Sequence, residues 1–425
     1  MSLYSGKLSN LVKSNSQYKH MACIPSLEEL EKFYVESSDF FSVPTITEPA
    51  RDDLFFTAKD VFNTYVLPTE MGSQLWEGHK AGNNARVISA ALDAGFKFLG
   101  KTKTSEFAVH EPTDTVNPWD SKRMTGTSSS GSAVSILLGE ADFSLATQSA
   151  ASISRPAAYL GIKALKPTFG LVPRTGVLKT CDPFDTVGFF AKNIGTMKDI
   201  LISLGAWGSN YPKNALHNRK DSQPVVGYFG IKALKRLISI SRSMQNEYES
   251  VLSVLNNKNV ALKEMVVPEY FEHIHESHEI VYTKSLEYYF KNELTEDDKI
   301  SPSFEEFVEL GSSRSPKEFT RELNNHSLRV REFNSWMMNE KVDFLITPAV
   351  EGVAPLRNEK ELDDLSLFWT YLQVPAITAA FNLDPTKQLP LGFNLISYKR
   401  NDLNLIDFTQ NYLGEEILDT SKFWL

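Results

Sequence analysis

The sequence has few of the features that signal a disulfide-bonded, membrane-spanning or secreted protein. Its 425 residues include two cysteines, Cys23 and Cys181, too few for a disulfide framework or a metal cluster. The longest apolar runs fall well short of the roughly 18 residues that a transmembrane helix needs. Lys7 and Lys13 near the N-terminus are not followed by an apolar stretch, so we expect no secretory signal and a cytoplasmic location.

Positive charge is also scarce. The chain has 44 Lys and Arg against 53 Asp and Glu, a formal net charge of −9, and shows no basic stripe. Because nucleic acids bind basic surfaces, this balance argues against a nucleic-acid partner. The composition, 42% hydrophobic and 23% charged, is typical of a globular protein that buries a large core.

Common nucleotide and serine-hydrolase motifs do not fit the serine-rich run GTSSSGSA. No GxGxxG occurs. Gly126 and Gly131 have P-loop spacing, but Ser132 stands where the P-loop lysine belongs. GxSxG fails because Ser130 replaces its second glycine. A solvated Gly/Ser loop and a nucleophilic serine with a lysine base both remain open.

Small residues and hydroxyls gather in one stretch, residues 100–192. Small side chains let backbone approach a ligand closely, so this composition favours a binding cradle over a packed core. The notable segments, in order, are GKTKTSEFA (100–108), NPWD (117–120), GTSSSGSA (126–133), ATQSAASISRPAAY (146–159), LKPTFG (165–170) and FDTVGFFAK (184–192).

Together these segments resemble the amidase signature hydrolases, a family with a Ser–cis-Ser–Lys triad. The resemblance implies that Lys101 is the base, Ser128 the bridging serine after a cis peptide bond, and Ser152 the nucleophile. The 24 residues from Ser128 to Ser152 match the family's spacing. The family fold implies one α/β domain, with a central mixed β-sheet covered by helices on both faces. It implies neither a cofactor nor a metal.

The chemistry of such a triad constrains its lysine. A serine hydroxyl must lose its proton as it attacks an amide, and only a neutral lysine can take that proton. Burial without a carboxylate partner lowers a lysine pKa from about 10.4 towards about 7–8. We therefore expect Lys101 to be buried and clear of acids. Lys59, in the Lys59-Asp60 pair after an apolar run, is expected to form a surface salt bridge or to support the site as a nearby charge.

The resemblance places the oxyanion hole on the N–H groups of Ser149, Ala150, Ala151 and Ser152. The family usually has Gly-Gly where this chain has Ala150-Ala151. If either position needs a positive φ, alanine adds roughly 1 kcal/mol of strain. We expect a lower rate or a narrower substrate range from this change.

Three further residues are predicted to bind substrate: Thr127, Gln148 and Arg155. Gln148 and Arg155 resemble the malonamidase-type branch, in which the arginine pairs with a substrate carboxylate. The planar guanidinium matches a carboxylate in geometry, so we predict an amide that carries an acidic group. The alternative is a structural arginine that pairs with an internal acid.

Outside the signature the chain divides into three regions. Residues 1–50 are predicted to form a helical segment packed on the core, with Ser26 and Glu29 as a capping box. Residues 51–425 are the amidase signature domain, and about 231–341 is its variable, mostly helical, substrate-shaping region. Within that region His273, His275 and His278 are interpreted as a solvated helix face, in preference to a metal site.

Three function classes follow from the resemblance. The first is an amidase that hydrolyses a small carboxamide through an acyl-serine intermediate, with a small-molecule partner, no nucleic acid, no membrane, and a homodimer as one assembly to consider. The second is the glutaminase subunit of a tRNA-dependent amidotransferase. The third is a non-catalytic or acyl-transferring relative, an option that Ala150-Ala151 keeps open.

Overall fold

An eleven-stranded mixed β-sheet organises the chain in the computed structural model, which describes residues 2–38, 54–205, 223–361 and 364–424. The strand order across the sheet is β1-β3-β2-β4-β6-β5-β10-β11-β9-β7-β8. The strands are β1 (Met21–Cys23), β2 (Phe55–Lys59), β3 (Lys97–Thr102), β4 (Phe143–Gln148), β5 (Lys163–Lys166), β6 (Thr186–Ala191), β7 (Val225–Tyr228), β8 (Ala261–Glu264), β9 (Phe344–Pro348), β10 (Ala376–Leu383) and β11 (Pro390–Ser397).

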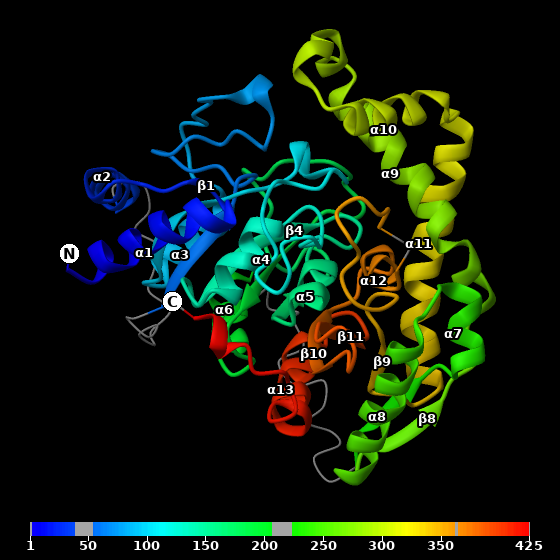
Figure 1. Ribbon diagram of the computed structural model, residues 1–425. Helices are drawn as coiled ribbons and strands as arrows, with labels where there is room; N and C mark the ends of the chain where they lie inside the picture. Colours follow the sequence, from blue (N-terminus) through cyan, green and yellow to red (C-terminus); the bar gives the residue numbers. More distant parts are fainter. Residues whose placement is uncertain (1, 39–53, 206–222, 362–363, 425) are drawn as a thin grey trace.

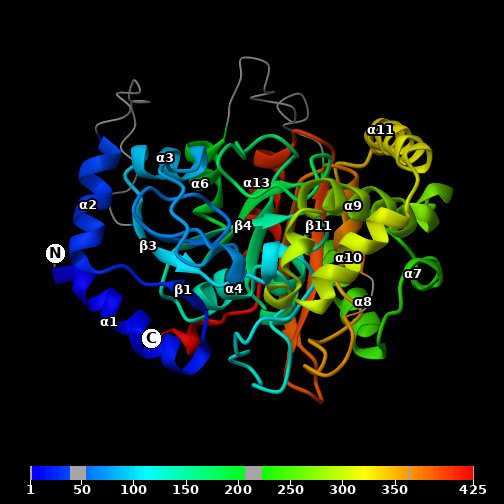
Figure 2. The same cartoon turned by 90° about the horizontal axis from the view of Figure 1, so that it is seen from above.

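Helices cover both faces of this sheet. Figure 2 shows α3, α6 and α13 along one side of the strands and α4 along the other. The helices are α1 (Ser2–Tyr18), α2 (Leu27–Ser38), α3 (Arg86–Asp93), α4 (Ser130–Leu137), α5 (Ser154–Leu160), α6 (Met197–Leu204), α7 (Ile231–Leu237), α8 (Arg242–Asn257), α9 (Ile274–Phe290), α10 (Pro302–Ser313), α11 (Pro316–Asn339), α12 (Ser366–Tyr371) and α13 (Asp402–Leu413). The predicted single α/β domain with a helix-covered mixed sheet is confirmed.

Strand β2 lies inside the sheet and is buried along its whole length. Its run FFTA has the continuous apolar character of a strand covered on both faces. It pairs in parallel with β3 on one side and β4 on the other. The carboxyl ends of the three strands therefore meet at one edge of the sheet, which brings Lys59 close to Gln148.

The register of β2 and β3 decides which face each side chain meets. Ala58 pairs with Lys101, and Lys59 pairs with Thr102. Paired residues point to the same face and successive residues to opposite faces, so Lys59 and Lys101 project to opposite sides of the sheet. Thr102 Oγ1 lies 2.6 Å from Ser132 Oγ of α4. Lys59 therefore points to the face that α4 covers.

A seam between β5 and β10 joins the two halves of the sheet. The two strands pair antiparallel, with Lys166 opposite Ala376. The buried Lys166 Nζ donates across the seam to the carbonyl of Val374 at 2.5 Å. Asp402 of α13 accepts hydrogen bonds from both the N–H and the hydroxyl of Thr168, at 2.7 and 2.6 Å. Strands β1–β6 and β7–β11 thus form one continuous sheet.

The N-terminal segment is tied to the core by a strand as well as by helices. The predicted capping box is confirmed: Glu29 N–H donates to Ser26 Oγ at 3.1 Å, and Ser26 N–H donates to Glu29 Oε2 at 2.9 Å. Strand β1, which the helical prediction for residues 1–50 missed, pairs with β3. The predicted domain boundary after residue 50 lies outside the described residues.

The variable region is mostly helical, as predicted, with β8 as its strand. Helices α10 and α11 each begin with a serine cap followed by proline, a common helix start. Helices α9, α10 and α11 pack together in the upper right of Figure 1, and α9 also contacts α12. Among the described residues, the helices are too short or too polar to span a bilayer.

Candidate active site

Three buried polar side chains form a chain of contacts at the edge where β2 and β4 end. Lys59 Nζ lies 2.6 Å from Ser128 Oγ, and Ser128 Oγ lies 3.1 Å from Ser152 Oγ. Ser128 follows the cis Thr127–Ser128 peptide bond and lies just before α4. Ser152 lies in the loop between β4 and α5 and is 9% exposed. The structure thus brings Ser128 and Ser152 together, with a lysine from β2 behind them.

The surroundings of Lys59 favour a neutral amine. Its side chain is fully buried, and its hydrogen-bond partners are the hydroxyls of Ser128 and Thr147, the latter at 3.2 Å. Burial lowers the pKa of Lys59 to about 7, although the charge of Asp185 acts in the opposite direction. A hydroxyl can accept from an amine N–H or donate to its lone pair, so these partners suit a lysine that takes up and returns a proton.

Lys101 occupies a different environment, and the prediction that it lies beside Ser128, clear of acids, is wrong. Its Nζ is 2.8 Å from Asp60 Oδ1, 3.0 Å from Thr69 Oγ1 and 3.2 Å from the carbonyl of Pro68. These three acceptors match the three N–H groups of an ammonium. Burial lowers the pKa of Lys101 below its ordinary value, and the adjacent Asp60 carboxylate opposes that effect.

The register of β2 on β3 explains why Lys59, and not Lys101, lies beside Ser128. The surface salt bridge predicted for Lys59 is also wrong, because Lys59 is buried and it is Lys101 that pairs with Asp60. The sequence did contain a signal: a lysine directly after the buried run FFTA belongs to the strand itself. The strand order that sets Lys59 next to Ser128 depends on pairing between distant segments, which the sequence does not display.

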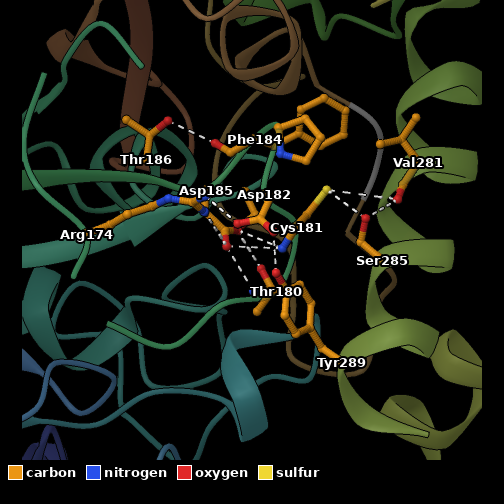
Figure 3. A network of polar contacts seen from close by, with 12 residues as sticks. Arg174, Thr180, Cys181, Asp182, Phe184, Asp185, Thr186, Val281, Ser285 and Tyr289 are labelled. Carbon is orange, nitrogen blue, oxygen red and sulfur yellow. Dashed lines mark hydrogen bonds and ion pairs between the residues drawn. The ribbon is translucent and has the colours of Figure 1, made fainter. Parts of the chain in front are cut away.

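Asp185, from the FDTVGFFAK segment, is the centre of a second polar network, drawn in Figure 3. Its carboxylate accepts from Ser149 Oγ at 2.6 Å, from Thr180 Oγ1 at 2.7 Å and from the Thr180 N–H at 2.9 Å. Arg174 Nη1 lies 3.3 Å from Oδ2, the oxygen that accepts the Thr180 N–H. Burial raises the pKa of Asp185, while these hydrogen bonds act to lower it. The network fixes the start of the loop that carries Ser152.

A small cavity of about 10 Å³ lies against this network. Its lining includes Thr147, Ser149, Thr180 and Asp185. That volume is close to the minimum that holds a single water molecule. The cavity therefore has room for about one water molecule beside the loop.

Gln148 holds the loop internally, so its predicted role in binding substrate has no support in the geometry. Its Oε1 accepts from the N–H groups of Ile153 and Ser154 at 2.7 and 2.8 Å. Its Nε2 donates to Thr370 Oγ1 of α12 at 2.8 Å. Both ends of the amide are therefore used within the protein.

Neither alanine that replaces the family's Gly-Gly has a positive φ. Positive-φ residues other than glycine occur elsewhere in the described chain, but Ala150 and Ala151 are not among them. The strain expected from alanine at these positions is therefore absent. Both methyl groups are buried within the loop.

Arg155 pairs with two internal carboxylates, which is the structural alternative rather than the predicted substrate contact. Its Nε lies 2.7 Å from Asp364 and its Nη1 2.5 Å from Glu361. Thr127 Oγ1 donates to the same Glu361 oxygen at 2.8 Å. The guanidinium already faces two negative charges, so a third carboxylate from a substrate would meet net repulsion. Thr127, too, is engaged within the protein.

One of the three clustered histidines is part of this site. His278 of α9 is 3% exposed, and its Nε2 lies 2.8 Å from the carbonyl oxygen of Ser149. Its ring stacks on Phe184 at 4.6 Å between centroids. Burial lowers the pKa of His278 to about 3, so the ring is neutral at ordinary pH. The prediction of a solvated helix face is wrong for His278.

Comparisons with known proteins show the family of the chain and its fold. The family model named Amidase matches residues 54–405. A glutamyl-tRNA(Gln) amidotransferase subunit of Carboxydothermus hydrogenoformans is 26% identical over 79% of this chain and 76% of its own length. The corresponding subunit of Methanosarcina acetivorans is 42% identical over 34% of this chain, a match that spans only 31% of that relative. Peptide amidase from Stenotrophomonas maltophilia has the same fold, with a TM-score of 0.77 at 20% identity over 97% of this chain and 92% of its own.

The names of these relatives correct the expected partners. The two amidotransferase relatives are subunits of an enzyme named for a tRNA, so the expectation that excluded nucleic acid is wrong. That expectation was based on the net charge of −9 of one chain. In a multi-subunit enzyme the basic surface can belong to another chain, so the charge of one component does not decide the matter.

Proposed function

This chain belongs to the Amidase family, and from that premise we propose that it cleaves the C–N bond of a carboxamide through an acyl-Ser152 intermediate. One observation carries the proposal: a fully buried lysine contacts a serine that in turn contacts a second serine, at 2.6 and 3.1 Å. In this proposal Lys59 takes the role first expected for Lys101.

In the first half of the reaction, Ser152 Oγ attacks the carbonyl carbon of the amide. Its proton passes to Ser128 Oγ, and the Ser128 proton passes to the lone pair of Lys59. When the tetrahedral intermediate collapses, the C–N bond breaks and the leaving nitrogen takes a proton back along the same path. The products of this half are the free amine or ammonia and an ester of Ser152.

In the second half, water attacks the ester with the same groups as base. The acid is released and Ser152 recovers its proton, so the net reaction is amide plus water giving carboxylic acid plus amine. The backbone N–H groups from Ser149 to Ser152 are proposed to stabilise the oxyanion. Donors of this kind contribute about 3–4 kcal/mol each in well-studied hydrolases.

The relatives favour one form of this activity, an ammonia-releasing subunit that acts on glutamine and delivers ammonia to a partner protein. The match to the Carboxydothermus hydrogenoformans protein covers most of both chains, which supports this form over a stand-alone amidase.

Two finer predictions lose their basis. The malonamidase-type branch and an acidic substrate both depended on Arg155 and Gln148, whose polar groups are occupied by internal partners. We retain residues 51–425 as the catalytic domain, with about 231–341 shaping the substrate pocket. The contact of His278 with the loop supports that role for the variable region. The cytoplasmic location stays a prediction.

Ammonia release from a panel of amides tests the proposal. The panel contains glutamine, malonamic acid and propionamide, each assayed with the wild type and with Ser152→Ala. We expect turnover of at least one amide by the wild type, glutamine foremost, and its loss in the variant. Near-full turnover by Ser152→Ala would reject the nucleophile.

Purification of the tagged chain under native conditions distinguishes an amidotransferase subunit from a stand-alone amidase. A stoichiometric second protein favours the amidotransferase, and a monodisperse active chain favours the amidase.

A non-catalytic relative is the remaining class, and covalent labelling separates it from an enzyme. A fluorophosphonate probe should add to Ser152 of the wild type, with the adduct located by mass spectrometry of the peptide. Ser130, another buried serine of the same serine-rich segment as Ser128, is the internal control and should stay unlabelled. An unlabelled Ser152 would favour the non-catalytic class.

A further inference from the structure

The loop between β4 and α5 is held by side chains from two distant helices. The carbonyl oxygen of Ser149 lies 2.8 Å from His278 Nε2 of α9. The carbonyl oxygen of Ala150 accepts a hydrogen bond of 2.7 Å from Thr370 Oγ1 of α12. Two successive carbonyls next to the proposed nucleophile are therefore fixed by residues more than 120 positions away in the sequence.

Fixing a carbonyl also fixes the N–H of the next residue. In a trans peptide the C=O of one residue and the N–H of the next point in opposite directions in one rigid plane. His278 thus sets the direction of the Ala150 N–H, and Thr370 sets that of the Ala151 N–H. Within the described residues, the hydrogen bonds include none donated by the N–H groups of Ala150, Ala151 or Ser152. These donors are free to serve a ligand.

The chemistry of His278 is suited to a fixed donor. A carbonyl oxygen can only accept, so Nε2 must carry the hydrogen. The ring is held between Phe184, at 4.6 Å, and Tyr282, at 5.4 Å between centroids. The side chain is 3% exposed, and the lowered pKa keeps its ring neutral at ordinary pH. The hydrogen bond from Nε2 is therefore made in a single protonation state.

Thr370 is held just as firmly. It is completely buried, and its Oγ1 accepts from Gln148 Nε2 at 2.8 Å while donating to Ala150. Gln148 in turn accepts from the N–H groups of Ile153 and Ser154. The loop is therefore braced on both sides of Ser152.

We propose that His278 and Thr370 are positioning residues that aim the N–H groups of Ala150 and Ala151 at the oxyanion formed when Ser152 attacks an amide. The inference depends on the proposed function, because it assigns a purpose to the loop of that same site. Through His278, helix α9 of the variable region then contributes to the rate of the reaction. The packing of aromatic rings around His278 alone would not require the hydrogen bond to Ser149.

Paired substitutions separate the hydrogen bond from the packing. His278→Phe keeps an aromatic ring against Phe184 and removes the donor, whereas His278→Gln keeps an N–H donor near the position of Nε2. We expect His278→Phe to lower kcat by roughly 10–100-fold with little change in KM, since a misdirected oxyanion donor weakens the transition state more than the ground state. His278→Gln should recover most of kcat.

His326 provides the matched control. It is also a buried histidine, its Nε2 lies 2.8 Å from the carbonyl of Tyr371, and burial lowers its pKa to about 4. His326→Phe should lower the Tm about as much as His278→Phe while changing kcat far less. The infrared carbonyl stretch of the acyl-enzyme adds a direct measure: it should move to higher frequency in His278→Phe and stay in place in His326→Phe.

A second pair keeps the test decisive if His278→Phe does not fold. Thr370→Val removes the hydroxyl at nearly constant volume, and Thr370→Ser restores it, so kcat should fall in the first and recover in the second.

Wild-type kcat and carbonyl frequency in a folded His278→Phe or Thr370→Val would overturn the inference, as would equal losses of kcat in His278→Phe and His326→Phe. If Ser152→Ala keeps its turnover, the proposed function fails as well. If only the His278 and Thr370 variants behave like wild type, the function stands and the positioning role fails.

Discussion

Two buried lysines on neighbouring strands have opposite surroundings, and the difference shows what makes a lysine a base. Lys59 and Lys101 are both fully buried. Lys59 faces the hydroxyls of Ser128 and Thr147, while Lys101 faces the carboxylate of Asp60. Burial lowers the pKa of both lysines. Only Lys101 is in contact with a carboxylate, which acts to raise its pKa again.

The comparison separates two outcomes of one physical effect. Desolvation penalises the ammonium form of any buried lysine. An adjacent carboxylate offsets this cost and keeps the charge, which gives a structural ion pair. Hydroxyls offset it much less, so the proton is released and a general base results. Three substitutions or conditions sharpen this comparison, in decreasing order of expected effect.

The largest effect is expected from Lys59→Met, which removes the proposed base. We expect kcat/KM to fall by roughly 10⁴-fold or more, as in other serine hydrolases that lose a triad member. The free energy of unfolding should stay level or rise, because no acid in contact with Lys59 is left unpaired. Steady-state kinetics and urea denaturation measure the two quantities. Retained activity would mean that a group other than Lys59 is the base.

Lys101→Met should affect folding more than catalysis. It leaves the buried Asp60 carboxylate without its cation, which typically costs about 3–5 kcal/mol. Adding Asp60→Asn should recover much of that loss, because the remaining side chain is uncharged. The check is urea denaturation of both variants beside activity per folded molecule. A stable, inactive Lys101→Met would contradict the division of roles.

The pH dependence of the reaction gives the smallest and most direct test. Lys59 must be neutral to accept a proton, and its pKa is lowered to about 7. Activity should therefore be low in acid, rise about tenfold per pH unit below pH 7, and level off above it. The profile of kcat/KM against pH measures this for the free enzyme. A profile of kcat/KM that is flat from about pH 5 to about pH 8 would contradict a base that titrates near pH 7.

The sequence was sufficient for much of the fold and for two of the three central residues. The apolar run before the Lys59-Asp60 pair forms β2, and the family resemblance implied a shared site for Ser128 and Ser152, whose Oγ atoms lie 3.1 Å apart. The lysine was misassigned because faces alternate residue by residue along a strand. A bulge between Phe56 and Ala58 also shifts the register of β2 on β3, and no local pattern indicates such a shift.

His278 shows a second limit of sequence reasoning. Three histidines within six residues, His273 to His278, look equivalent in the sequence, but His273 lies just before α9, and the helix turns His275 and His278 in different directions. His278 meets the loop, while His275 lies 3.2 Å from the carbonyl of Asp364. Which direction is buried depends on how α9 packs against segments more than 80 residues away, and the sequence of the helix alone does not contain that information.

The seam between β5 and β10 has a consequence for any shortened form of this chain. A fragment ending at residue 205 would contain Lys59, Ser128 and Ser152, every group that moves a proton in the proposed reaction. It would lack Asp364, Thr370 and Val374, which hold Arg155, the Ala150 carbonyl and Lys166 from the far half. Such a fragment would have the reactive groups without the contacts that align them. We therefore expect the N-terminal half alone to be inactive.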